Sequence, residues 1–145
     1  MKIRLGFVSN SSSSSFIVIG AGLFDVPFFS KKELAVPGDF GGTKEFGWTP
    51  KKHADFGSRL NFAYLQAIDD INLKMLETVL KEEMYIDSIQ WNIFPYYDSL
   101  DYGYIDHQSS AYEGKNLQMF ESKEVLKKFL FCLDSFVYTD NDNSD

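Results

Sequence analysis

A run of serines near the start of the chain is the group of side chains best suited to chemistry. The five consecutive hydroxyls belong to Ser11, Ser12, Ser13, Ser14 and Ser15. Hydroxyls and backbone amides in a turn can converge on a phosphate, so a ligand-binding loop is one interpretation. No lysine follows at P-loop spacing, and Gly20-Ala21-Gly22 has no third glycine at dinucleotide-binding spacing. A structural or partner-facing loop is therefore the first interpretation, and a nucleotide or phosphate site is the alternative.

Other catalytic and metal-binding patterns are weak. A nucleophilic serine needs a base, and His53 and His107 both lie in polar segments. Asp106 precedes His107, but neighbouring residues of a strand point to opposite faces and make a poor orienting pair. The two histidines and the isolated Cys132 show no zinc-binding spacing. The sequence predicts no catalytic residue, no metal ligand and no cofactor, with an enzyme that uses the serine loop as the alternative.

A cluster of tyrosines is the better candidate for recognition. Its members are Tyr96, Tyr97, Tyr102 and Tyr104. Amphipathic rings of this kind are enriched at the centres of protein interfaces. Packing into the core is the first interpretation of these rings, and a partner-binding surface, for which they are the candidate residues, is the alternative.

Composition narrows the class of partner. The chain has 145 residues and a net charge of -7, to which Asp140, Asp142 and Asp145 contribute. It shows no basic stripe to neutralise phosphates, which disfavours direct binding of nucleic acid. No apolar run approaches the length of a membrane span, and a single cysteine suits a reducing compartment. We expect one domain over residues 1–139, an acidic disordered tail over 140–145, no membrane association and a cytoplasmic location.

The first half of the chain must position the serine run. Residues 2–8 and 16–20 are apolar and β-prone, which predicts a strand on each side of a serine loop, the second strand being central in its sheet. Residues 20–57 are rich in glycine and proline, which predicts an irregular stretch with one short helix near 30–36. A loop of this length indicates either a packed excursion or a functional surface.

The second half has clearer periodicity. Apolar residues at helical spacing predict a helix over 58–83, with Ser58 as its N-cap and a possible break at residues 69–72. Residues 85–94 and 102–107 are predicted to pair as a hairpin. Ser122 is predicted to cap a further helix, followed by a strand over 135–139. Together these elements predict an α+β fold, in which a small mixed or antiparallel sheet packs against two or three helices.

The opening MKIRLGFVSNSSSSSF, residues 1–16, resembles one shared by a group of bacteriophage and prophage proteins of uncharacterised function. Residues 59–66 and 139–144 are similar to further segments of that group. The resemblance implies a phage origin and carries no activity or site residue with it.

These observations favour a phage-encoded accessory protein that binds a host or phage protein in the host cytoplasm, in host takeover or in countering a defence. Two alternatives remain open at this point. One is a nucleotide- or phosphate-binding protein or enzyme that uses the serine loop, and the other is a minor component of the virion.

Overall fold

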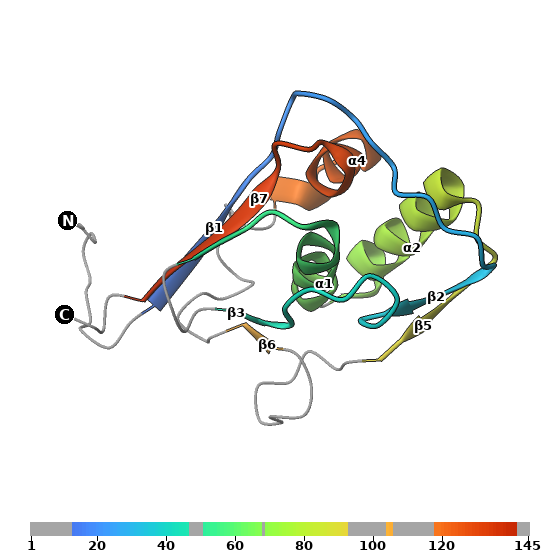
Figure 1. Ribbon diagram of the computed structural model, residues 1–145, viewed down its shortest axis with the longest axis horizontal. Helices are drawn as coiled ribbons and strands as arrows, with labels where there is room; N and C mark the ends of the chain where they lie inside the picture. The colour runs from blue at the N-terminus through green and yellow to red at the C-terminus, as the bar shows by residue number, and fades with distance from the viewer. Residues whose placement is uncertain (1–12, 47–50, 68, 93–103, 106–117, 142–145) are drawn as a thin grey trace.

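The computed structural model describes residues 13–46, 51–67, 69–92, 104–105 and 118–141. Its largest sheet has three antiparallel strands in the order β1 (Ser13–Val18), β7 (Phe136–Asn141) and β4 (Lys51–His53) (Figure 1). The register places Ser13 opposite Asn141 and Val18 opposite Phe136. The predicted strand after the serines therefore exists, but β7 and not β1 occupies the middle of this sheet. The strand predicted at residues 2–8 lies outside the described residues.

Two short parallel strand pairs replace the predicted hairpin. Strand β2 (Glu33–Val36) pairs with β5 (Ser88–Trp91), and β3 (Glu45–Phe46) pairs with β6 (Tyr104–Ile105). Leu34 and Val36 of β2 are fully buried, and this alternating face matches that of β5. The short helix predicted near residues 30–36 was wrong, because residues 33–36 form β2 and bury alternate side chains as a strand does. Pro37 also disfavours helical backbone at Val36.

The long predicted helix is divided at the expected place. Helix α1 (Phe56–Gln66) is followed by α2 (Asp70–Met84), and Asp69 caps α2 by accepting a hydrogen bond from the Asn72 amide. The predicted N-cap of the first helix was wrong, because Asp55 caps α1 and accepts from the Ser58 amide at 3.0 Å. A short 3-10 helix, η2 (Gln118–Phe120), precedes α4 (Lys123–Phe131). Ser122 caps α4 as predicted, by accepting a hydrogen bond from the Val125 amide.

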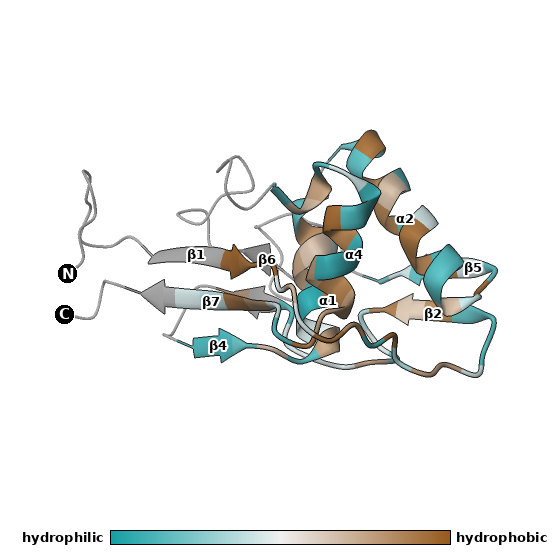
Figure 2. Ribbon diagram, turned by 90° about the horizontal axis from the view of Figure 1, so that it is seen from above, coloured by the Kyte–Doolittle hydropathy of each residue, from teal (hydrophilic) through white to brown (hydrophobic). Residues whose placement is uncertain are grey.

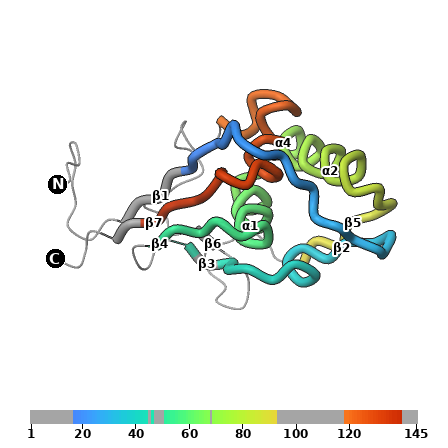
Figure 3. The backbone as a smooth tube through the Cα atoms, turned by 45° about the horizontal axis from the view of Figure 1, so that its top comes forward, coloured from blue at the N-terminus to red at the C-terminus, as the bar shows by residue number. Residues whose placement is uncertain are grey.

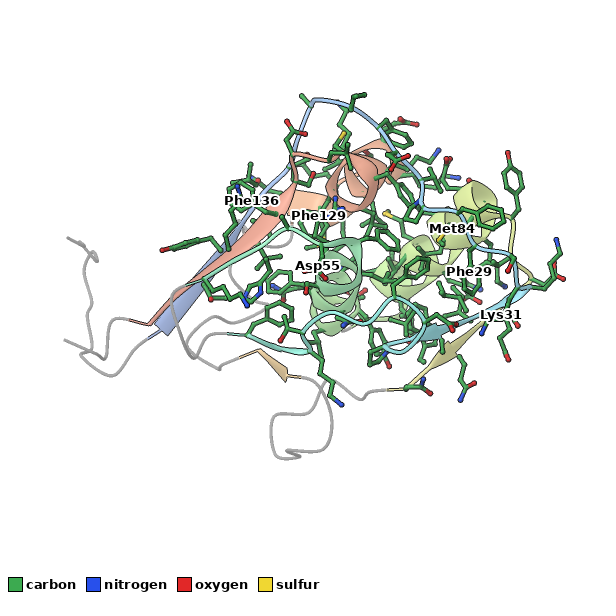
Figure 4. The ribbon with its side chains drawn as sticks, viewed as in Figure 1. Phe29, Lys31, Asp55, Met84, Phe129 and Phe136 are labelled. Carbon is green, nitrogen blue, oxygen red and sulfur yellow. The ribbon has the colours of Figure 1, made fainter. Side chains whose placement is uncertain are left out.

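Helix α1 lies at the centre of the molecule, between the three-stranded sheet and the other helices (Figures 1 and 3). Every residue from Gly57 to Gln66 is buried, which is typical of a helix surrounded on all sides by protein. The core around it includes Phe62 of α1, Leu76 and Leu80 of α2, and Phe129 of α4, the last labelled near the centre in Figure 4. Helices on one small antiparallel sheet confirm the predicted α+β class.

Buried polar side chains of α1 fasten the neighbouring segments. Arg59 donates from one terminal nitrogen to the carbonyls of Phe129 (3.2 Å) and Cys132 (2.7 Å), at the end of α4. Those carbonyls lack partners within α4, so the guanidinium caps the helix. Burial lowers the pKa of Arg59, an effect that the nearby Asp55 carboxylate opposes.

On its other side, α1 holds the loop before β3. The Asn61 amide donates to the carbonyls of Gly41 (3.2 Å) and Thr43 (2.8 Å). The backbones come so close that a Cβ on Gly57 would lie 2.5 Å from the carbonyl oxygens of Phe40 and Gly41. Glycine is therefore required at position 57 for this loop to pack on the start of α1.

The C-terminal strand reaches into the predicted tail. Strand β7 begins near the predicted position and extends to Asn141, so Asp140 and Asn141 belong to the sheet. Residues 142–145 lie outside the described part of the chain.

Figure 2 shows the contrast between the hydrophilic β4, with exposed Lys51 and Lys52, and the more hydrophobic β2.

Candidate functional site

Three residues of the serine run lie in a strand of the described structure and not in a loop. Ser13, Ser14 and Ser15 are strand residues of β1, opposite Asn141, Asp140 and Thr139. Ser11 and Ser12 lie outside the described residues. A ligand site at these serines stays a prediction, although three of the five follow an extended strand in place of the predicted loop.

The predicted tyrosine surface also lies largely beyond the described part. Tyr96, Tyr97 and Tyr102 are outside it, and of Tyr104 only the backbone, in β6, is described. Of the two histidines, the structure describes only His53. His53 is buried in β4 with its ring edge-on to Phe46, at 5.3 Å between centroids, whereas His107 lies outside the described residues. Burial and the neighbouring Lys51 lower the pKa of His53.

A different candidate surface lies along residues 19–32, and we call this segment of the chain the strap. The strap leaves β1, passes along the outside of α4 and ends at β2 (Figures 1 and 3). It covers the first part of the segment for which the sequence indicated either a packed excursion or a functional surface. The structure shows features of both, since one face of the strap is fastened to the end of α4 and the other is exposed.

Side chains after α4 fasten the start of the strap. The Asp134 carboxylate accepts hydrogen bonds from the amides of Ala21 (3.3 Å) and Gly22 (3.1 Å). The buried Ser135 hydroxyl accepts from the Gly20 amide at 2.8 Å and donates to the Lys128 carbonyl at 2.7 Å. The glycine pair considered above as a partial nucleotide motif therefore packs against a carboxylate of the same chain.

These amides alter the titration of Asp134. The hydrogen bond from Gly22, helped by that from Ala21, lowers the pKa of Asp134 below its ordinary value, against the opposing effect of burial. The amides favour the charged form, so this carboxylate is a fixed negative charge at neutral pH.

The middle of the strap pairs with the chain after α4 through its backbone. The Asp25 amide donates to the Phe131 carbonyl, and the Leu133 amide donates to the Leu23 carbonyl, both at 2.8 Å. Phe24 lies opposite Cys132 in this antiparallel bridge, and its ring packs on Phe131 with 5.6 Å between centroids. This pairing fixes the backbone at residues 23–25.

Large apolar side chains on the strap and beside it face solvent. The exposed fractions are 66% for Leu23, 47% for Phe24, 87% for Phe28 and 55% for Leu133. Leu133 adjoins Leu23 through their shared hydrogen bond, so the set spans two segments far apart in sequence. We call these four residues the strap surface. Large exposed apolar side chains gathered in one region mark interaction sites more often than isolated ones do.

Acidic groups border the strap surface. Asp25 follows Phe24 and Asp134 follows Leu133 in the chain, and both are exposed. Farther along the strap, Lys31 pairs with Asp39 at 3.1 Å, at the outer edge of the molecule in Figure 4. The part of the surface around Phe24 and Leu133 is therefore apolar with a negative border.

Sequence reasoning did not single out the strap surface. The pairs Leu23-Phe24 and Phe28-Phe29 have the composition of core residues, and their short spacing has no clear period. The available signal was their place between glycines and Pro27 in a long irregular stretch. Of the pair Phe28-Phe29, Phe29 is the ring that is covered, because it packs on Phe40 with 5.5 Å between ring centroids. The residues next to this pair in the sequence do not indicate that contact.

The combination of fold and surface describes an α+β protein with an exposed apolar strap. No family model, no curated protein and no solved structure matches the chain. In the described ranges, no helix is long and apolar enough to cross a membrane. The same ranges contain no group of three or more histidine, cysteine and acidic side chains placed to hold a metal ion.

Proposed function

We propose that this protein is a phage-encoded accessory protein that acts in the host cytoplasm by binding another protein, in host takeover or in countering a defence. The observation that carries the proposal is the strap surface. Leaving Leu23 and Phe28 in water forgoes the stabilisation that burial of such side chains contributes, about 1.5–3 kcal/mol each. A partner that covers them recovers this free energy on binding.

The character of the surface also supports a protein as the partner. Apolar and aromatic side chains at the centre with charged groups at the border are the usual composition of protein interfaces. The resemblance of residues 1–16 to phage and prophage proteins supports the proposed origin and setting. The tyrosines predicted to bind a partner are a second surface for the same function, and they stay a prediction.

The decisive experiment compares the proteins retained by variants of the full chain. The test variant carries Leu23→Ser, Phe28→Ser and Leu133→Ser, and the matched control carries Ile71→Ser, since Ile71 is 76% exposed on α2. Each is immobilised and exposed to a lysate of bacteria that carry the corresponding phage. We expect proteins retained by the wild type and the control to be lost from the test variant, with unchanged melting temperatures.

Retention of the same proteins by the test variant would overturn the role of the strap surface. A parallel variant with Tyr96→Ser and Tyr97→Ser separates the two predicted surfaces. Loss of the retained proteins from this variant alone would assign the function to the tyrosines.

A further inference from the structure

Phe24 presents an unused pair of backbone hydrogen-bonding groups. In its antiparallel bridge with Cys132, the two hydrogen bonds are made by the flanking residues Leu23 and Asp25. In this type of pair, the N–H and C=O of Phe24 itself point away from Cys132. Within the described part of the chain neither group has a hydrogen-bond partner, and the same holds for the N–H and C=O of Val26, two residues on. The strap thus has the free edge of a strand at this point.

The free edge coincides with the apolar surface. Phe24 and Leu23 are both partly in solvent, and Leu133 lies across the bridge. A strand added beside Phe24 would satisfy its N–H and C=O while its side chains contact those of the strap surface. This is the mode of recognition in which the main chain supplies affinity and alternate side chains supply specificity.

The backbone groups of Phe24 and the acidic residues beside the strap surface indicate which kind of partner segment can bind there. A helix has no free main-chain groups along its length to pair with Phe24, so the segment must be extended. Asp25 and Asp134 flank the site, and the whole chain carries a net charge of -7. These charges disfavour a second copy of the chain and favour lysine or arginine between the apolar residues of the segment.

We propose that the partner inserts an extended segment of alternating apolar and basic residues, which adds to the strap as a strand at Phe24. This inference rests on the proposed function and specifies how the strap surface binds. It is tested with a synthetic peptide, so its outcome does not depend on finding the natural partner.

The probe is a peptide of about ten residues with alternating valine and lysine, added to the full-length, isotope-labelled protein. We expect the amide signals of Phe24 and Val26 to shift on titration and their hydrogen exchange to slow. Two control peptides carry the same charge. One has N-methyl groups on every second residue, which removes the donors along one edge, and the other is a helix-forming peptide of leucine and lysine.

A pair of variants isolates the contribution of the Phe24 backbone. Phe24→Ala and Phe24→Pro both remove the ring, but only proline removes the N–H. We expect the affinity of the peptide for Phe24→Pro to be lower than that for Phe24→Ala by about tenfold, the loss expected for one hydrogen bond of about 1.4 kcal/mol. Melting temperatures and amide spectra show whether both variants fold, and the N-methylated peptide decides the question on the wild type if the proline variant does not.

Three results would overturn strand addition: equal binding of the N-methylated or helical peptide, equal affinity of the two Phe24 variants, or no binding of the alternating peptide at about 1 mM. Each is distinct from failure of the proposed function. If the serine variant of the strap surface loses its captured proteins while strand addition fails, the surface binds through its side chains alone. If that variant keeps them, the strap surface has no part in the proposed function.

Discussion

Helix α1 buries four polar side chains, Ser58, Arg59, Asn61 and Gln66, whereas the strap leaves Leu23, Phe24 and Phe28 in solvent. Each arrangement reverses the usual preference of its residue types. In α1 most of the buried groups have partners, because Arg59 caps α4 and Asn61 holds the loop before β3. In the strap, backbone and side-chain hydrogen bonds hold the start of the segment to α4 and the chain after it, and of the exposed side chains Phe24 also packs on Phe131.

The difference separates stability from recognition. The α1 side chains stabilise the fold by satisfying backbone groups that would otherwise be buried without partners. The strap surface can vary with little cost to the fold, since its side chains have few neighbours. Substitutions in the two regions should therefore give opposite patterns of stability and binding.

The largest effect is expected at the buried guanidinium. Arg59→Ala removes the side-chain donor to the Phe129 and Cys132 carbonyls, of which Cys132 keeps the Ser135 amide, and opens a cavity. We expect a loss of about 3 kcal/mol in the free energy of unfolding. Denaturant unfolding measures it, and Arg59→Lys, which keeps the charge but not the planar fork, should lose less. A loss below about 1 kcal/mol for Arg59→Ala would show that the end of α4 does not need this cap.

A smaller effect of opposite sign is expected at Gln66. Its side chain is fully buried, and neither its amide nitrogen nor its carbonyl oxygen has a hydrogen-bond partner. Gln66→Leu replaces this unpaired amide with an apolar group of similar size, so we expect a gain of about 1 kcal/mol in the free energy of unfolding. A loss on substitution would mean that the amide is paired, and α1 would then have no unsatisfied polar side chain besides the Arg59 Nε.

A weaker, pH-dependent effect is expected where the strap is fastened. The pKa of Asp134 is lowered from 3.8 in the folded protein, so its contribution to stability is complete above that value and is lost as the pH falls through the folded pKa. The Gly22 amide signal should therefore titrate with a midpoint below 3.8. Asp134→Asn should remove this titration and lower the melting temperature by less than Arg59→Ala does. A midpoint above 3.8 would contradict the hydrogen bonds to the strap.

The smallest effect on stability is expected at the exposed ring of the strap. Phe28 is 87% exposed, so Phe28→Ser should change the free energy of unfolding by no more than about 0.5 kcal/mol. Thermal unfolding measures this, with Phe29→Ser as the contrasting variant because Phe29 packs on Phe40. Similar losses for both would erase the distinction between the surface and the fold on which the comparison rests.

Local signals in the sequence predicted the break between α1 and α2 and the start of α4, although they placed the N-cap of α1 at Ser58 in place of Asp55 and a helix where β2 lies. The break between α1 and α2 follows from the run of Asp69, Asp70 and Asn72, which have low helix propensity and good capping ability. The cap of α4 by Ser122 follows from its position before an apolar, helical pattern. These features depend on residues within a few positions of one another, which is why periodicity and capping rules predict them.

The sheets and the strap depend on distant residues, and local patterns were insufficient there. Strand β2 finds a parallel partner more than fifty residues later, and a four-residue apolar pattern does not identify such a partner. The serines of β1 have low β-propensity, yet Ser13, Ser14 and Ser15 pair with the C-terminal strand. The exposure of Leu23 and Phe28 likewise depends on where the chain after α4 holds the strap, which no short segment specifies.

The position of β7 has a consequence for synthesis of the protein. In the described sheet, β1 and β4 both pair with β7, and the strap is held by Asp134 and Ser135. These partners follow the segments that they hold by more than eighty residues, so the sheet and the strap cannot close until residues 134–141 have left the ribosome. During that interval α1 and α2 can form from local contacts, while β1 lacks its partner strand, and unpaired strand edges of this kind are prone to aggregate.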